Sequence, residues 1–398
     1  MTESAQDRRS IALAAVLVAA VGWLVLWTTT TPRTGWDGLM YHRFALEYAG
    51  APVVEQEAVA WDLFERYADQ ALVETVASGI EQGASPWEAI GQPSRERWVD
   101  IYRSRPMYPL LVGATYPLVG SVAPMLVSAL AVLIFTAAML VGVGWLTGYG
   151  VALMSVLLGF SNPRFAEWLI SMVPDGLGIA LWTASLVFTA IYVRAGQRRW
   201  VLALGLAATL LAFTRPIGAF LPLALLLAAS AAGLARRPEW RRLALATATS
   251  MVAVGIFAVY SVAMELPGLW DQLQDLPTRH FNRPDVADPI GWTVDVARAQ
   301  LANAWWTLAK DPSIWGPVVL AVIGFVLIAR SWALSPFVAA IAVLPLAYLA
   351  HPQLSEAPRI MAPLWASVSI GVSLVLVWVV ERLQRLPLRG PATESPAR

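Results

Sequence analysis

Two aspartates border apolar segments of the sequence, and each could take part in proton transfer. Asp37 lies in TGWDGLMYHRFA, shortly after an apolar run, and Asp175 follows Pro174 in SMVPDGLGIALW. If a helix begins near Asp37, Tyr41 lies one turn later on the same face. A carboxyl group in a partly desolvated pocket has a raised pKa and could act as general base toward an acceptor hydroxyl. Each acid could instead be a helix N-cap, for which Asp is a preferred residue, although the apolar residues on both sides of Asp175 favour a cavity-facing role there.

Four arginines near the ends of apolar segments are candidates for binding a phosphate group: Arg105, Arg164, Arg215 and Arg359. A guanidinium group stays charged and bonds phosphate oxygens in pairs, so several of them would suit a lipid phosphate or pyrophosphate. Any one of them could also contact the head groups of the surrounding phospholipid. Spacing does not separate these two hypotheses.

The three histidines are His42, His280 and His351. None has the HxxxH or HExxH spacing of a metal site, so the sequence predicts no metal ligands, and a need for a divalent cation is unsupported. His42 directly follows Tyr41, and we count both among the candidate substrate-binding residues. The sequence contains no cysteine, which excludes thiol chemistry. It contains no nucleotide-binding loop motif, so it gives no support to nucleotide-driven transport. Nothing indicates a nucleic-acid partner.

Composition indicates that these residues are positioned by membrane helices. Hydrophobic residues make up 58% of the 398 positions and charged residues 14%, against about half and about a quarter in a soluble domain. The sequence contains apolar stretches about as long as a membrane-spanning helix, which predicts an all-α polytopic membrane protein. We expect a single transmembrane domain over 1–398 with about ten helices. The predicted spans are 11–30, 121–146, 149–162, 168–193, 200–214, 216–234, 243–264, 313–330, 332–349 and 360–381.

The arginine clusters predict the orientation of these spans. With ten spans, five groups of arginines fall on one side, which the positive-inside rule assigns to the cytoplasm. The groups are Arg8/Arg9, Arg194/Arg198/Arg199, Arg236/Arg237/Arg241/Arg242, Arg330 and Arg382/Arg385/Arg389. Both termini are then cytoplasmic, with 11–27 as an uncleaved anchor and 387–398 as a tail in a multi-pass protein of the cell membrane. The candidate site is extracytoplasmic.

Two long segments fall on that extracytoplasmic side, 31–106 and 265–312. The first contains apolar residues at three- and four-residue steps from Trp61 to Val76, which predicts amphipathic helices lying flat on the outer leaflet. The stretch 107–120 is apolar but short and contains Pro109 and Pro117, so we expect an interfacial or re-entrant piece rather than a span.

In their order along the chain, these features resemble the GT-C superfamily of polyprenyl-phosphate-sugar-dependent glycosyltransferases, which includes protein O-mannosyltransferases and the lipid A aminoarabinose transferase. The shared layout is a cytoplasmic N-terminus, a first span that ends near an acid, and a long first outer loop with helices. RPMYPLLVGATYPLVG (105–120) resembles the family's Pro/Tyr-rich region. TRPIGAF around Arg215 and APRIMAP around Arg359 resemble the basic ends of later spans.

The resemblance implies a sugar transfer from a polyprenyl-phosphate donor to a glycan, lipid or protein acceptor at the outer face of the bilayer. It implies that Asp37 is the catalytic base or orients the acceptor, and that Asp175 supports it. Arg215 and Arg359 would hold the leaving lipid phosphate. Many relatives carry a second acid after the first, where this chain has Gly38. Two further hypotheses are a transporter or flippase of a lipid-linked substrate and a catalytically silent partner in envelope assembly.

Overall fold

All regular structure in the described part of the chain is helical. The structure is a computed structural model and describes residues 5–30, 34–82, 95–278, 283–308, 312–350 and 356–385. No β-strand occurs in these ranges. A helix satisfies its backbone hydrogen bonds within one segment, which is what a chain in hydrocarbon requires. The predicted all-α fold is confirmed for the described residues.

Several helical segments are long and apolar enough to cross a membrane, as expected for a multi-pass protein. Six are found among the described residues: Ser10–Thr29, Met107–Thr147, Pro174–Ala195, Pro216–Leu234, Trp240–Ala263 and Ala357–Gln384. Three shorter apolar helices are Tyr149–Ser161, Ser313–Ala329 and Trp332–Ala347. Together with α13 (Arg198–Ala212), these segments cover the ten predicted positions. The count of ten spans stays a prediction.

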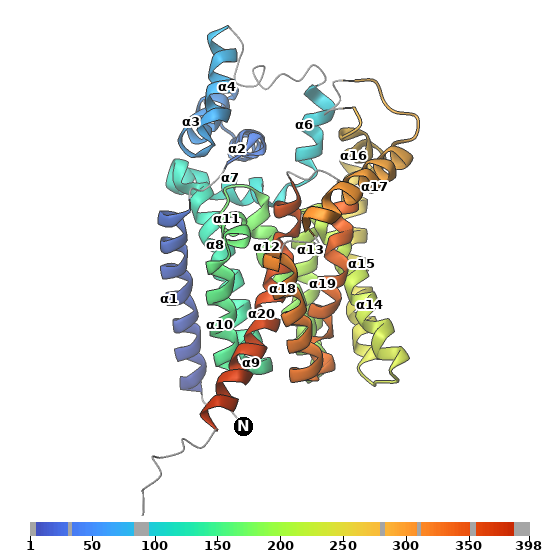
Figure 1. Cartoon of the computed structure of the whole chain (residues 1–398). Coiled ribbons are helices and arrows are strands. Elements are labelled where there is room, and N and C mark those ends of the chain that lie inside the picture. Colours follow the sequence, from blue (N-terminus) through green and yellow to red (C-terminus); the bar gives the residue numbers. More distant parts are fainter. Residues whose placement is uncertain are drawn as a thin grey trace, which may run out of the picture.

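These helices form one bundle that is built around α12 (Pro174–Ala195) (Figure 1). Its other members are α1 (Ala5–Thr29), α8 (Ala123–Ala137), η2 (Ala138–Val143), α9 (Gly144–Thr147), α10 (Tyr149–Ser161), α13, α14 (Phe220–Leu234), α15 (Trp240–Ala263), α18 (Pro312–Ile323), η4 (Gly324–Ala329), η5 (Trp332–Leu334), α19 (Ser335–Ala350) and α20 (Ala357–Gln384). Almost every residue of α12 is buried, including Trp182. Because α12 is apolar on all sides and rich in Gly, Ala, Ser and Thr, neighbouring helices can pack closely around it. The residue at its start, Asp175, is therefore placed by the most constrained helix of the fold.

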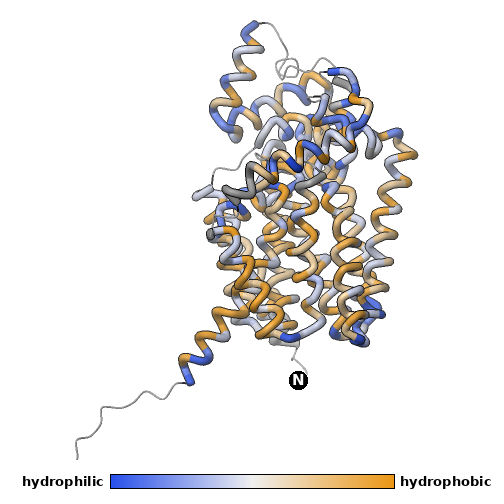
Figure 2. The backbone as a smooth tube through the Cα atoms, turned by 45° about the vertical axis from the view of Figure 1, so that its right-hand side comes forward, coloured by the Kyte–Doolittle hydropathy of each residue, from blue (hydrophilic) through white to orange (hydrophobic). Residues whose placement is uncertain are grey.

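The outer surface of the bundle is apolar, as contact with lipid requires. On α1, Leu13, Leu17 and Val21 are each more than half exposed. Such a large uncovered apolar surface is unusual in a protein surrounded by water. Figure 2 shows hydrophobic residues along the middle of the bundle and hydrophilic residues towards its two ends. The surface pattern agrees with a bilayer as the surrounding phase.

A break at Gly120 separates α7 (Met107–Val119) from the bundle helix α8. Gly120 has φ of 59°, a left-handed conformation that glycine adopts readily, and the short η1 (Gly120–Val122) follows it. Figure 1 shows α7 across the end of the bundle rather than along it. The apolar segment Met107–Thr147 is thus one continuous stretch by composition but changes direction at Gly120. This agrees with the separation of 107–120 from the following span.

Further helices form a cap over this end of the bundle. They are α2 (Trp36–Tyr48), α3 (Val53–Tyr67), α4 (Gln70–Glu81), α6 (Arg95–Arg103), α16 (Leu269–Asp275) and α17 (Pro289–Leu308). The periodicity from Trp61 to Val76 is divided between α3 and α4, because Asp69 caps α4 by accepting from the Ala71 backbone N–H at 3.0 Å. Phe64 and Val76 are buried in a small core that α2, α3 and α4 share. Figure 1 shows α4 directed away from the bundle, and its buried apolar residues contact α2 and α3. The position of these helices relative to the outer leaflet stays a prediction.

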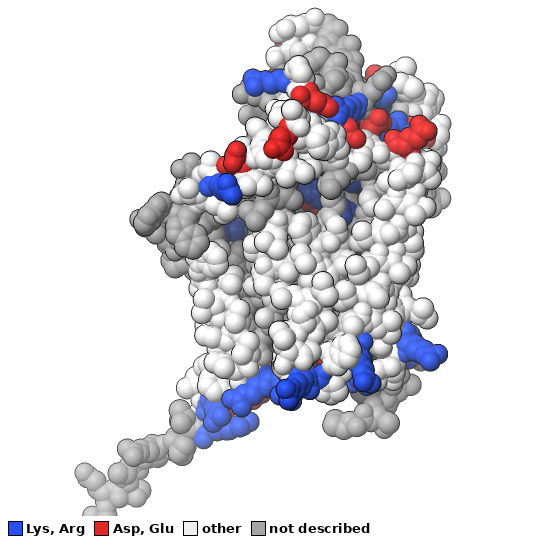
Figure 3. Space-filling model, turned by 90° about the vertical axis from the view of Figure 1, so that its right-hand side faces the viewer, with Lys and Arg blue, Asp and Glu red and all other residues white. Residues whose placement is uncertain are grey.

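The charged side chains differ between the two ends of the bundle. Figure 3 shows Lys and Arg concentrated at the end opposite the cap, whereas acidic residues gather with arginines on the cap. The first helix begins and α20 ends at the arginine-rich end (Figure 1). On the cap, Arg97 of α6 bonds Asp271 at 2.6 Å and Asp285 at 2.6 Å, and it thereby joins the segments 31–106 and 265–312.

Candidate functional site

The two candidate acids and two of the candidate arginines lie at helix starts or turns where the cap meets the bundle. Asp37 is in the first turn of α2, Asp175 in the first turn of α12 and Arg359 in the first turn of α20. Arg215 lies between α13 and η3 (Pro216–Ala219) with an extended backbone, φ −152° and ψ 142°. Because Pro216 follows it, an extended conformation at Arg215 is the favoured one. The four side chains come from four different segments.

Arg359 joins both aspartates in one network. It binds Asp175 in a bidentate manner, with Nε to Oδ1 at 3.0 Å and Nη2 to Oδ2 at 2.9 Å. The same Nη2 donates to Asp37 Oδ2 at 2.5 Å, and Nη1 donates to Glu356 Oε2 at 3.2 Å. Arg215 also donates to Asp175 Oδ1. Paired charge-assisted hydrogen bonds of this kind are among the strongest in proteins.

The side chains of the network are largely buried, but three of them keep some exposure to solvent. The side chain of Asp175 is 4% exposed, whereas those of Arg359, Arg215 and Asp37 are 12%, 15% and 18% exposed. Figure 3 shows a hollow below the charged cap, with acidic and basic atoms visible inside it. The indole ring of Trp168 lies under the guanidinium group of Arg359, 5.3 Å from its Cζ atom. A cation at this distance from an indole face is attracted by the electrons of the ring.

Two tyrosines and a third arginine extend the network towards α6. Tyr102 donates its hydroxyl proton to Asp37 Oδ1 at 2.9 Å, and Arg105 donates from Nη1 to the hydroxyl oxygen of Tyr41 at 2.9 Å. The rings of Tyr41 and Tyr102 are in edge-to-face contact, with centroids 5.4 Å apart. Tyr41 therefore lies beside Asp37, as the one-turn spacing predicted.

Arg105 differs from the other two arginines because no carboxylate binds it among the described residues. The only side-chain hydrogen bond of Arg105 there is the one to Tyr41, and its buried Nε has no partner. The network thus contains three guanidinium groups against the carboxylates of Asp37 and Asp175 in its interior, with Glu356 at the rim. Counting Glu356, three carboxylates balance three guanidinium groups, but none of the three binds Arg105, so its guanidinium group is the one left to attract an anionic ligand.

Helix capping does not explain either aspartate. The N-cap of α2 is Gly35 and that of α12 is Val173, and neither helix start has a side-chain cap. Asp37 instead bonds Tyr102 and Arg359, which lie on other elements. Asp175 bonds Arg215 and Arg359. Of the two hypotheses that the sequence left open, the structure agrees with side chains directed into a shared site.

The expected rise in the pKa of Asp37 is wrong for this arrangement of charges. Burial by itself raises the pKa of Asp37, but the neighbouring guanidinium groups of Arg359 and Arg105 and the hydrogen bond from Arg359 outweigh it. The pKa of Asp37 therefore lies below its ordinary value, and the group is an ionised carboxylate near neutral pH. The sequence predicted burial but not the pairing with arginine that reverses its effect.

Two other candidates lie outside the ion-pair network. His42 is buried one residue beyond Tyr41, with Nε2 at 3.1 Å from the Met172 carbonyl oxygen, and burial lowers its pKa to about 4. Neutral His42 therefore links α2 to the turn before α12 through this hydrogen bond, and its role is to position α2. Arg164 is partly exposed in the first turn of α11 (Pro163–Leu169), where Asn162 Oδ1 accepts from its backbone N–H at 3.0 Å. His280 and His351 lie outside the described residues.

Tyr102, Glu356 and Trp168 are members of the site that sequence reasoning missed. Tyr102 is in the segment DIYRSR, directly before Arg103 and Arg105, and such an aromatic residue in a basic segment was a possible signal. Arg103, its neighbour, turns to the surface and bonds Glu47 at 3.0 Å. Among the described residues no group of three or more His, Asp or Glu could hold a metal ion. Both aspartates of the network are instead bound by guanidinium groups.

The chain was compared with known proteins in three ways. No protein-family model matches it, and neither the curated proteins nor the solved structures give a match.

Proposed function

We propose that the protein is a membrane glycosyltransferase of GT-C type that transfers a sugar from a polyprenyl-phosphate donor to an acceptor hydroxyl. The observation that carries the proposal is the bridge of Asp37 and Asp175 by Arg359. These residues are 322 and 184 positions from Arg359 along the chain, yet they share one guanidinium group in a partly open site. Buried ionisable residues at the end of membrane helices are costly and usually have a functional reason.

The proposed topology places this site on the extracytoplasmic side. About ten helices cross the membrane, and both termini lie in the cytoplasm. The arginine-rich end of the bundle, which Figure 3 shows opposite the cap, supports this orientation through the positive-inside rule. The cap helices would then cover the site from the aqueous side, and the lipid-linked donor would enter from the outer leaflet.

The donor phosphate is proposed to bind at Arg105, Arg215 and Arg359. Arg105 supports this role most directly, because it is the cation of the network that has no carboxylate partner among the described residues. Arg215 and Arg359 already bond Asp175, so a phosphate would share or displace these hydrogen bonds. The donor is a phosphodiester, and cleavage of its bond to the sugar releases polyprenyl phosphate, which is a good leaving group when cations stabilise the departing anion. No nucleotide is needed.

Asp37 is proposed to receive the proton of the acceptor hydroxyl. The hydroxyl oxygen attacks the anomeric carbon, the bond from that carbon to the phosphate oxygen breaks, and polyprenyl phosphate leaves with the bonding electrons. An Asp37 that Arg359 holds ionised is a weak base. When the donor phosphate takes hydrogen bonds from Arg359, the pKa of Asp37 rises and the carboxylate becomes a stronger base. Donor binding would thus activate the base.

A reconstituted system tests the proposal directly. The purified full-length protein is placed in liposomes with polyprenyl-phosphate-linked hexoses and pentoses and a panel of hydroxyl acceptors. We expect release of free polyprenyl phosphate together with a glycosylated acceptor. Movement of the intact lipid-linked sugar across the bilayer, with no cleavage of the sugar–phosphate bond, would instead establish the transporter hypothesis.

Replacing Tyr102 by phenylalanine tests the hydrogen bond to Asp37. The Tyr102 hydroxyl stabilises the ionised form of Asp37, so its loss raises the pKa of Asp37. We expect the acidic limb of the kcat profile against pH to move upward by about half a unit to one unit, with a moderate loss of rate. Tyr67→Phe on α3 is the matched control. An unchanged profile in Tyr102→Phe would show that Asp37 does not titrate in the rate-limiting step.

A further inference from the structure

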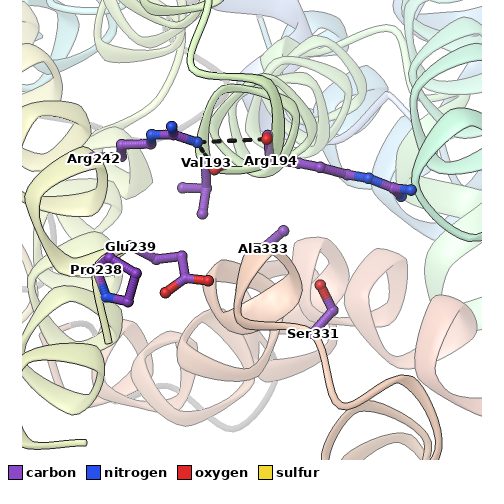
Figure 4. Close-up of a pocket in the computed structure, with 7 residues that line it drawn as sticks. All are labelled: Val193, Arg194, Pro238, Glu239, Arg242, Ser331 and Ala333. Carbon is purple, nitrogen blue, oxygen red and sulfur yellow. Dashed lines mark hydrogen bonds between the residues drawn. The ribbon is translucent and has the colours of Figure 1, made fainter. Parts of the chain in front are cut away.

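A pocket of about 280 Å³ lies at the arginine-rich end of the bundle, opposite the candidate active site. Figure 4 shows its lining, which comes from the end of α12, the turn between α14 and α15, and the turn before η5. Its polar side chains include Glu239, Arg242 and Ser331. A volume of this size is close to the lower limit for small-ligand sites in proteins, about 300 Å³.

Glu239 is half-buried and supplies one unsatisfied carboxylate oxygen to this pocket. Figure 4 shows its side chain directed into the space between the α14–α15 turn and Ala333. The Oε2 atom is buried without a hydrogen bond, and within the described ranges the carboxylate forms no ion pair. A buried carboxylate oxygen without a donor is unfavourable, because it has lost water and gained nothing in exchange. A hydrogen-bond donor from a ligand would remove that cost.

Arg242 supplies a positive charge on a different wall. Its Nη1 donates to the Val193 carbonyl oxygen at 2.6 Å, which fixes the guanidinium group at the C-terminal end of α12. In the described structure its Nε and Nη2 atoms make no hydrogen bond, and Arg242 forms no ion pair with Glu239. Arg194 also lines the pocket, but Figure 4 shows its side chain directed away from Glu239, and its Nη1 donates to the Leu146 carbonyl oxygen. Glu239 and Arg242 are therefore the negative and the positive group directed at the pocket, and they do not pair with each other. A zwitterion of matching length would satisfy both.

We propose that this pocket binds a phosphoethanolamine group, with its ammonium on Glu239 and Ser331 and its phosphate on Arg242. The group could belong to phosphatidylethanolamine in the adjacent leaflet or to a soluble phosphoethanolamine. The surface beside the pocket suits the lipid, because Leu234 and Trp240 are exposed there at 87% and 43%. Exposed apolar and indole side chains at this level of a bundle contact acyl chains and head groups. The proposal does not depend on the glycosyltransferase function.

Native mass spectrometry of the purified full-length protein tests this site. The protein is mixed with equal amounts of phosphatidylethanolamine, phosphatidylglycerol and phosphatidylcholine of the same acyl chains. We expect preferential retention of phosphatidylethanolamine, and a loss of that preference by roughly tenfold in Glu239→Gln, since a charge-assisted hydrogen bond is removed. Glu381→Gln is the matched control, because Glu381 is an exposed acid on α20 that pairs with Arg385.

Further measurements distinguish the lipid from soluble phosphoethanolamine as the ligand, and a second pocket variant controls for misfolding of the first. Binding of soluble phosphoethanolamine without lipid would assign the site to the soluble compound, whereas retention of the lipid alone would assign it to the leaflet. Ser331→Phe fills the pocket without altering Glu239, so it should abolish the preference even if Glu239→Gln is unstable. Equal retention of the three lipids by the unmodified protein, or an unchanged preference in both pocket variants, would overturn the proposal.

Discussion

Asp37→Asn is expected to lower the rate of sugar transfer by about a hundred- to ten-thousandfold, the usual contribution of a general base. The asparagine oxygen can still accept the hydrogen bond from Tyr102, and Arg359 keeps both bonds to Asp175. The variant should therefore fold and insert, and its defect should be chemical. The measurement is the initial rate of polyprenyl-phosphate release by the reconstituted protein at saturating donor.

Asp62→Asn is the control for this variant. Asp62 is an exposed acid on α3 that bonds Arg66 of the same helix at 2.7 Å, so the same substitution there leaves the site untouched. Its rate should equal that of the unmodified protein. Transfer by Asp37→Asn at a normal rate would reject the role of Asp37 as base. Loss of transfer together with loss of folded protein would show that Asp37 is chiefly a structural partner of Arg359.

Arg359→Gln is expected to destabilise the protein by about 3–5 kcal/mol, the cost of removing one partner from a buried ion pair. Arg359 is the residue that bonds Asp37, Asp175 and Glu356 at once, and its side chain is 12% exposed. Without it, the side-chain bonds left to Asp37 and Asp175 among the described residues are those from Tyr102 and Arg215. The measurement is the free energy of unfolding in mixed micelles.

A double variant distinguishes loss of the network from a general defect. In Asp37→Asn/Arg359→Gln one uncompensated charge is absent, so the double variant should be less destabilised than the sum of the two single ones. Arg385→Gln is the control, because Arg385 lies in an exposed pair on the same helix and should change stability by about 0.5 kcal/mol or less. Simple additivity would contradict a direct interaction between Asp37 and Arg359.

Several parts of the site could be predicted from the sequence because they stand out locally. Four ionisable residues lie at the borders of apolar segments: Asp37, Asp175, Arg215 and Arg359. A charge in such a place is energetically costly and usually has a function. Their pairing was not predictable in the same way. Arg359 was assigned to a lipid phosphate, yet in the structure it binds Asp37 and Asp175. No periodicity relates residues hundreds of positions apart.

The sequence by itself determined the all-helical, multi-pass character of this protein and the residues that border its apolar segments. The physical reason is that hydropathy and helical periodicity are local properties, so each segment carries its own signal. Tertiary structure alone decided that Tyr102 reaches Asp37, that Arg105 has no carboxylate among the described residues and that Glu239 faces a pocket. These features depend on which helix ends meet. The same meeting of helix ends places the guanidinium groups of Arg359 and Arg105 beside Asp37, and they outweigh burial and lower its pKa.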